Sequence, residues 1–224
     1  MQRIIWQNKW YAIPLVIWWL VASISILVKG NEQLFLDLNV FHDPVSDAVF
    51  SFITHLPEFW GHLFVIALGF SIKIKFGFAA GMSLALNGSI TAFLKHHVFE
   101  EYIRPSLHFK EMTLNYVDGV ELAQRFSFPS GHSSAAFALT LALTFMLANN
   151  KKWLGLLFFL LAFLIGYSRI HLCQHFPRDV LAGSGIGVFS TILMFSIIIP
   201  LFNMAKGNWP NKSLQSVLKK SFSR

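Results

Sequence analysis

The sequence predicts an all-α integral membrane protein with six transmembrane helices, and three observations lead to this prediction. Hydrophobic residues make up 54% of the 224 residues and charged residues only 13%, whereas soluble domains contain roughly 25% charged residues. The apolar residues gather in segments that are long enough, or nearly long enough, to span about 30 Å of hydrocarbon. Lysine and arginine flank these segments unevenly, which is typical of a membrane topology.

Six apolar segments are expected to form the spanning helices, and the second and the fifth are the shortest. They cover residues 10–28, 58–73, 76–94, 133–149, 153–168 and 184–204. An amphipathic helix is expected after Pro44, lying along the outer interface between the first two spans. The fourth span follows a Pro-Ser-Gly-His stretch, in which proline and serine are helix-start signals. Because no linker or internal repeat is evident, residues 1–224 are expected to form a single membrane-embedded domain.

The distribution of charge predicts that the N- and C-termini are both cytoplasmic. In this orientation the inner segments hold eleven of the eighteen basic residues and none of the acidic residues, as the positive-inside rule requires. These basic residues are Arg3, Lys9, Lys73, Lys75, Lys151, Lys152, Lys206, Lys212, Lys219, Lys220 and Arg224. The polar motifs then lie at the outer face. No nucleic-acid partner is expected, because no Lys/Arg-rich run is interleaved with aromatic residues.

Two polar stretches carry the chemistry predicted for the outer face. The first is Pro-Ser-Gly-His at residues 129–132, and the second runs from Ser168-Arg169 to Asp179. In the second stretch His175 and Asp179 are four residues apart and would share one face of a helix. The carboxylate can then hold the far N–H of the ring, fix its tautomer and raise its nucleophilicity.

A second histidine and two arginines extend the predicted site. His132 can protonate the group that leaves after a nucleophilic attack. Arg104 and Arg169 indicate an anionic electrophile, and phosphate fits the planar fork of a guanidinium group best. Ser130 and Gly131 would add a hydroxyl and an amide donor at the start of the fourth span. Together these residues indicate a membrane phosphatase.

A zinc site is the alternative interpretation of the second stretch. His171, His175 and Asp179 lie at successive i+4 positions, which is suitable geometry for metal ligands. Arg169 and Arg178 lie close by in the sequence and disfavour a second cation at the same place. We therefore expect a site without a metal ion or another cofactor.

The two stretches resemble, without substitution, two of the three signature motifs of the type 2 phosphatidic acid phosphatase superfamily. The third motif in that family is a lysine, six residues, and then Arg-Pro. Here Arg104-Pro105 is present, but eight residues separate it from Lys95, and His97 holds the expected position. Either residue could serve the motif, and we favour Lys95 because a long, flexible stem tolerates such a shift. The six-helix pattern extends the resemblance over roughly the whole chain.

The resemblance implies a mechanism and a substrate class. His175 would attack phosphorus to give a phosphohistidine, Asp179 would orient it, and His132 would protonate the leaving group and then activate water. The residues expected to bind the phosphate are Lys95, Arg104, Ser130, Gly131 and Arg169. The substrate would be a lipid phosphate within the bilayer, with undecaprenyl pyrophosphate the first candidate, ahead of phosphatidylglycerophosphate, phosphatidic acid and lipid A phosphates.

Two other functions fit the same residues. A lipid phosphotransferase would form the same phosphohistidine and pass the phosphoryl group to a sugar or lipid hydroxyl instead of water. A transporter or scaffold would use the basic residues only to hold a phospholipid, and would not need His175 or His132. The short inner loops and small size favour a bacterial inner-membrane enzyme whose site faces the periplasm or the exterior.

Overall fold

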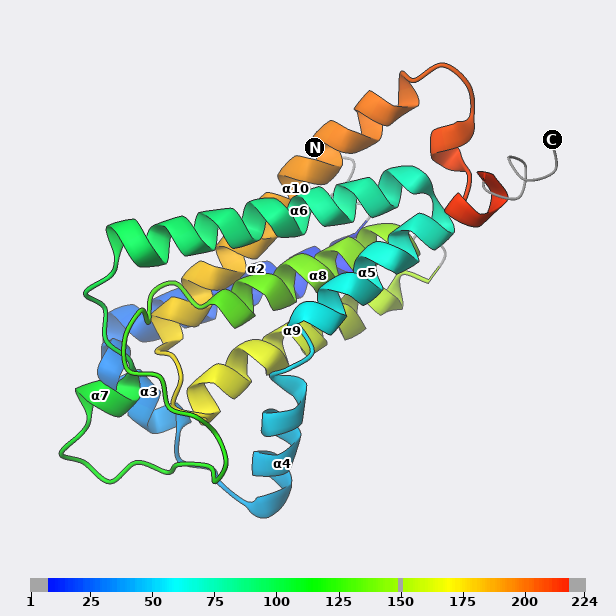
Figure 1. Ribbon diagram of the computed structural model, residues 1–224. Coiled ribbons are helices and arrows are strands. Elements are labelled where there is room, and N and C mark those ends of the chain that lie inside the picture. The colour runs from blue at the N-terminus through cyan, green and yellow to red at the C-terminus, as the bar shows by residue number, and fades with distance from the viewer. Residues whose placement is uncertain (1–7, 149–150, 218–224) are drawn as a thin grey trace.

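The computed structural model describes residues 8–148 and 151–217, and the secondary structure of these residues is helical. The elements are α2 (Lys9–Lys29), α3 (Asn31–Leu38), α4 (Pro44–Ile53), α5 (Phe59–Ile72), α6 (Ile74–Phe93), the π-helix η1 (Leu94–Val98), α7 (Pro105–His108), α8 (Gly131–Leu147), α9 (Trp153–His171), α10 (Pro177–Asn203) and the 3₁₀-helix η2 (Trp209–Asn211). The six long helices run side by side, while α3, α4 and α7 gather at one end of the bundle (Figure 1).

Each of the six predicted segments contains a helix, and four of these helices are long and apolar enough to cross a membrane. These four are α2, α6 with its extension η1, α9 and α10. The other two, α5 and α8, have 14 and 17 residues and are shorter than a usual span. The all-α class and the short second segment are thus confirmed. The expectation of a short fifth segment is wrong, because α9 continues to His171 and has 19 residues.

The number of spans and their orientation stay predictions. Residue 149 of the fourth segment lies outside the described residues. The same holds for residues 1–7 and 218–224, so the side of the membrane on which the termini lie is not tested. The helix expected after Pro44 is confirmed as α4, where the Asp43 side chain caps the first turn by accepting from the amides of Val45 and Ser46.

The last long helix begins at Pro177 instead of residue 184. Proline is favoured in the first turn of a helix, where its missing N–H needs no partner, and Asp179 two residues later accepts a hydrogen bond from the amide of Phe176. His175 therefore lies just before α10, and Asp179 lies in its first turn. The prediction that both residues share a face of one helix is wrong.

Helix α8 is the central helix of the bundle and packs against α5, α6, α9 and α10. Two glycines of α10 permit a very close approach. A Cβ atom on Gly183 would lie 2.4 Å from the carbonyl oxygen of Ser130, and one on Gly187 would lie 2.1 Å from that of Ser134. Small residues allow such backbone contact between membrane helices. This contact fixes the start of α8, with the Pro-Ser-Gly-His stretch, beside the start of α10, with Asp179.

Candidate active site

The predicted site residues lie at the end of the bundle where α3, α4 and α7 gather (Figure 1). They come from the π-helix after α6, the loop before α7, the start of α8, the last turn of α9, and the loop and first turn of α10. In that order they are Lys95, Arg104, Ser130, Gly131, His132, Arg169, His175 and Asp179. The fold thus brings residues from five separate segments to one end of the molecule.

The pair His175 and Asp179 is buried at the centre of this arrangement. Their side chains are 1% and 0% exposed, and Nδ1 of His175 lies 3.4 Å from Oδ2 of Asp179. The same carboxylate oxygen accepts hydrogen bonds from the Ser127 hydroxyl at 2.5 Å and the Phe176 amide at 3.0 Å. Because Nδ1 faces the carboxylate, Nε2 on the far side of the ring is the nitrogen available for attack.

The surroundings of His175 favour its neutral form. Burial, together with the positive charges of Arg104, Lys95 and Arg169, holds the pKa of His175 well below its usual range. Burial and neighbouring cations both disfavour a charged imidazole. A neutral imidazole keeps the lone pair that a nucleophile needs.

Arg169 is buried, and only part of its guanidinium group is bonded. Its Nη1 donates a hydrogen bond of 2.5 Å to the hydroxyl of Thr54, the C-terminal cap of α4. Its Nε has no hydrogen-bond partner among the described residues. A buried donor without a partner is costly, so this group is suited to bind an anion that enters the site.

Lys95 faces the cluster, whereas His97 does not. The Lys95 ammonium group donates a hydrogen bond of 2.8 Å to the carbonyl oxygen of Phe126 and acts electrostatically on His175. His97 is exposed, and its ring lies against Phe93. The π-helix η1 accounts for part of the unusual spacing of this motif, because its wider turn takes up one of the two extra residues.

Arg104 is held by backbone and side-chain acceptors. Its Nη1 donates to the side-chain oxygen of Gln174 at 2.8 Å, and its Nε donates to the carbonyl oxygen of Arg125 at 3.0 Å. Gln174 is the residue immediately before His175, and its own amide group donates to the carbonyl oxygen of Glu121. These contacts fix the Arg104 guanidinium group beside the His175 loop.

His132 lies in the first turn of α8 and has an acidic partner. Its Nε2 is 3.3 Å from Oε1 of Glu58, the N-terminal cap of α5. The same oxygen lies 2.8 Å from Nδ1 of His55. Both histidine rings therefore share one carboxylate. Glu58 favours the protonated form of His132, but burial and the positive charge of Arg169 outweigh it and lower the pKa of this ring to about 4.

Ser130 and Gly131 form the start of α8. The Ser130 hydroxyl oxygen accepts from the Ser133 hydroxyl at 2.8 Å and caps the helix by accepting from the Ser133 amide. The first amides of a helix have no partner within the helix. Gly131 and His132 line a cavity of about 400 Å³ together with Glu58 and Lys95.

Sequence reasoning did not identify four residues that contact the predicted set. Glu58 contacts His132, Thr54 contacts Arg169, Ser127 contacts Asp179, and Gln174 contacts Arg104. Ser127 and Gln174 adjoin the two motifs in sequence, and this proximity was a usable signal. Thr54 and Glu58 lie far from their partners in the chain, and only the packing of α4 and α5 brings them to the site.

Of the three residues of the alternative zinc site, His175 and Asp179 lie together, but His171 does not join them. Nε2 of His171 lies 2.7 Å from Oδ1 of Asp47, and Nδ1 of His42 lies 3.0 Å from the same oxygen. These three form the one group in the described part of the chain whose ligand atoms are close enough to hold a metal ion. The side chain of His171 thus contacts Asp47 instead of His175 or Asp179, and the possible metal-binding group of His42, Asp47 and His171 includes neither of those two residues.

Comparison with known proteins gives a consistent result. A sequence model of the PAP2 superfamily matches residues 76–202. A lipid A 4'-phosphatase of Bacteroides thetaiotaomicron is 28% identical over 182 residues, which cover 78% of this chain and 79% of the relative. An undecaprenyl-diphosphatase of Sulfolobus acidocaldarius is 26% identical over 95% of this chain and its own full length. The crystal structure of Aquifex aeolicus LpxE superposes with a TM-score of 0.65 at 26% identity, over 74% of this chain and 94% of that one.

Proposed function

The chain belongs to the PAP2 superfamily, and on that premise we propose that it is a membrane lipid phosphatase that works without a metal ion. It hydrolyses a phosphomonoester or a terminal pyrophosphate on a lipid. The observation that carries the proposal is the burial of His175 beside Asp179, where burial and the charges of Arg104, Lys95 and Arg169 hold the pKa of the ring well below its usual range. Asp179 and Glu58 offset these three cations only in part, and a bound phosphate would neutralise the positive charge that remains.

The reaction proceeds in two steps on this arrangement. In the first, the lone pair of His175 Nε2 forms a bond to phosphorus while the bond from phosphorus to the leaving oxygen breaks. The bound phosphate offsets the positive charge of Arg169 and so raises the pKa of His132. The protonated His132 ring donates its proton to the leaving oxygen, and Asp179 stabilises the positive charge that develops on the His175 ring. The lipid product leaves, and a phosphohistidine stays on the enzyme.

The second step regenerates the enzyme. His132, now neutral, takes a proton from a water molecule, and the water oxygen attacks phosphorus. The bond from phosphorus to His175 breaks, and inorganic phosphate is released. Arg104, Arg169 and Lys95 bind the equatorial oxygens in both steps and stabilise the charge that builds up on them.

A lipid-linked substrate is consistent with where the site lies. The motif residues lie at the ends of apolar helices, so a phosphate can enter the site from the membrane surface while its hydrocarbon stays in the bilayer. Among lipids, undecaprenyl pyrophosphate is our first candidate, because a relative that the chain matches over nearly its whole length is named an undecaprenyl-diphosphatase. The lipid A 4'-phosphatase relative makes a lipid A phosphate the second candidate. We place the enzyme in a bacterial inner membrane with the site facing outward.

Phosphate release tests this proposal. Purified, detergent-solubilised protein is incubated in EDTA with a panel of lipid phosphates, beside the His175→Ala variant. We expect release from one or two lipids by the wild type and none by the variant. The appearance of a phosphorylated sugar or lipid without free phosphate would replace the hydrolase by the phosphotransferase. Release that EDTA abolishes would contradict a metal-independent mechanism.

A further inference from the structure

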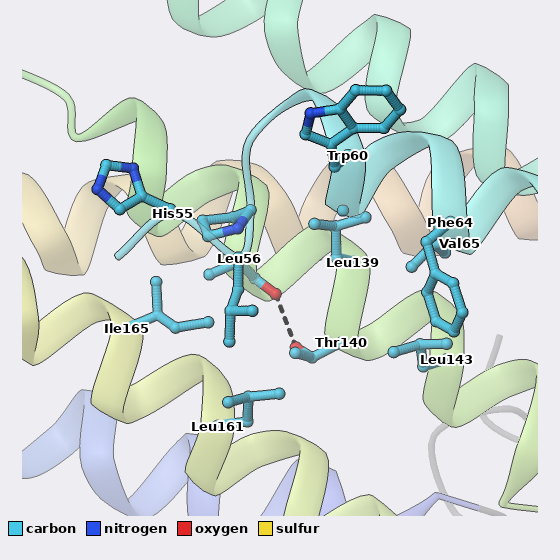
Figure 2. Close-up of a pocket in the computed structure, with 13 residues that line it drawn as sticks. His55, Leu56, Trp60, Phe64, Val65, Leu139, Thr140, Leu143, Leu161 and Ile165 are labelled. Atoms are coloured by element: carbon cyan, nitrogen blue, oxygen red, sulfur yellow. Dashed lines mark hydrogen bonds between the residues drawn. The ribbon is translucent and has the colours of Figure 1, made fainter. Parts of the chain in front are cut away.

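An apolar groove lies between α5, α8 and α9, beneath the loop that joins α4 to α5 (Figure 2). Its volume is about 410 Å³, within the range of small-molecule binding pockets. Figure 2 shows Leu56, Leu139, Leu161 and Ile165 pointing into the same space. The remaining lining residues are His55, Pro57, Trp60, Gly61, Phe64, Val65, Ala136, Thr140 and Leu143.

The groove offers no free hydroxyl to a ligand at its centre. Thr140 is the polar residue on its inner wall, and its hydroxyl donates to the carbonyl oxygen of Ala136 at 2.8 Å, the contact drawn in Figure 2. The same hydroxyl lies 3.0 Å from that of Tyr11. The wall therefore suits a hydrocarbon ligand, since a polar group placed there would lose its hydrogen bonds with water.

The groove lies along α8 next to its catalytic end, and His132 itself lines the neighbouring cavity of about 400 Å³. His132 lies one helical turn before Ala136, which lines the groove, and Thr140 and Leu143 follow on the same face. Residues four apart on a helix lie one above the other. His132, the proposed general acid, thus lies one turn before the row of α8 residues that forms one wall of the groove.

Helix α9, which forms the opposite wall of the groove, also has a site residue about one turn beyond its lining residues. Arg169 lies one turn after Ile165 and two turns after Leu161, and both of these residues line the groove. The phosphate-binding arginine and the general acid therefore both lie about one turn above the groove, on the two helices that form its walls.

We propose that this groove binds the hydrocarbon chain of the leaving group during catalysis. This inference rests on the proposed function. His175 attacks phosphorus in line with the bond that breaks, so the leaving oxygen lies on the side of His132, which protonates it. The lipid is attached to that oxygen, and its chain must therefore run away from His132. The groove begins one turn below His132, where that chain would start.

A second apolar cavity is a poorer place for the chain. It has a volume of about 260 Å³ and lies between α2, α3, α9 and α10. From α9 it is lined by Phe163, Tyr167 and Ile170, which do not share the face of Arg169. His132 and the rest of α8 do not line it.

Filling the groove tests the proposal. Leu161→Trp places a large side chain into it, and Leu164→Trp makes the same change on the exposed side of the same helix, outside the groove. The activity ratio compares kcat/KM for farnesyl diphosphate with that for p-nitrophenyl phosphate, which has no hydrocarbon chain. We expect Leu161→Trp to lower this ratio at least about tenfold, the factor that two excluded methylene groups carry. Leu164→Trp should leave the ratio within about twofold.

A binding measurement gives an answer that does not depend on turnover. A farnesyl phosphonate with a diazirine in its chain is photolysed with the wild-type protein, and the labelled residues are mapped by mass spectrometry. Labelling of α5, α8 and α9 residues of the groove is expected. Labelling near Val21 of α2, or an unchanged ratio in Leu161→Trp, would overturn the proposal. If the wild type hydrolyses neither phosphate, the proposed function fails, and the labelling still decides whether the chain occupies the groove.

Discussion

Glu58 and His132 are 74 residues apart in the chain, and their side chains meet at 3.3 Å across the start of two helices. Glu58 caps α5, and His132 lies in the first turn of α8. The contact places a carboxylate beside the proposed general acid, just as Asp179 stands beside the proposed nucleophile. Both proposed catalytic histidines therefore lie beside a carboxylate, and Glu58 is shared between His132 and His55.

Glu58→Gln is expected to lower kcat about tenfold and to leave KM within about twofold, because a hydrogen bond to a charged group contributes roughly that much. The loss falls on kcat, since the charge of His132 matters in the transition state and not in lipid binding. Glu58→Asp should recover part of the activity. Glu100→Gln, in an exposed position of the long loop, is the matched control. A pure KM effect of Glu58→Gln would show that Glu58 acts on binding and not on His132.

Lys95→Ala and His97→Ala separate the two candidates for the first motif. Lys95 faces the His175 cluster and His97 lies on the exposed side of the π-helix. We expect Lys95→Ala to reduce kcat/KM at least about tenfold, the scale of a lost charge-assisted contact to phosphate, and His97→Ala to change it less than twofold. Equal losses in the two variants would assign His97 a role in the site.

The low pKa of His175 predicts how activity depends on pH. Burial and the nearby cations hold this pKa well below its usual range, so the ring stays neutral as the pH falls through about 6.5, the ordinary value for histidine. The acidic limb of kcat/KM that belongs to His175 should therefore lie below that pH.

Lys95→Met checks this assignment. Removal of one positive charge raises the pKa of His175, so the acidic limb should move to higher pH in the variant. The substrate ionises identically in both measurements, and the shift between the two profiles can come only from the enzyme. Superimposable profiles would mean that the cations do not control the nucleophile.

Gly183→Ala tests the contact that positions the two helix starts. A Cβ atom at this position would lie 2.4 Å from the backbone oxygen of Ser130, whereas a Cβ atom on Gly185 would meet nothing within 4 Å. Gly183→Ala should lower the free energy of unfolding by about 1–3 kcal/mol, the usual effect of overpacking, and reduce activity. Gly185→Ala is the control and should melt at or above the wild-type temperature. Thermal unfolding followed by tryptophan fluorescence would measure both, and equal melting temperatures would mean that the helices are free to separate.

The sequence was sufficient to predict the parts of the fold that depend on local patterns, since apolar segments marked all six long helices. The two motif stretches predicted His132, Arg169, His175 and Asp179 as site residues, and the fold brings them to one end of the bundle. The start of α10 was placed too late, because hydropathy marks the apolar part of a helix and not its polar first turn. Pro177 was the signal that could have corrected this.

The contacts that complete the site depend on tertiary packing, which a single sequence does not reveal. Thr54 reaches Arg169 because α4 packs against α9, and Glu58 reaches His132 because α5 packs against α8. Neither residue belongs to a motif, and each has the appearance of an ordinary helix cap in the sequence. The π-helix at Lys95 was likewise hidden, since its wider turn appears in the sequence only as an irregular motif spacing.

The central claim is that His175 carries the phosphoryl group, and rapid quenching of a single turnover tests it most directly. The protein is mixed with a radiolabelled lipid phosphate, quenched in base, in which phosphohistidine survives, and analysed by mass spectrometry. We predict a transient phosphoryl group on His175 that decays as free phosphate appears, and its absence in His175→Ala. A turnover that releases phosphate without labelling His175, or that labels another residue, would contradict the account.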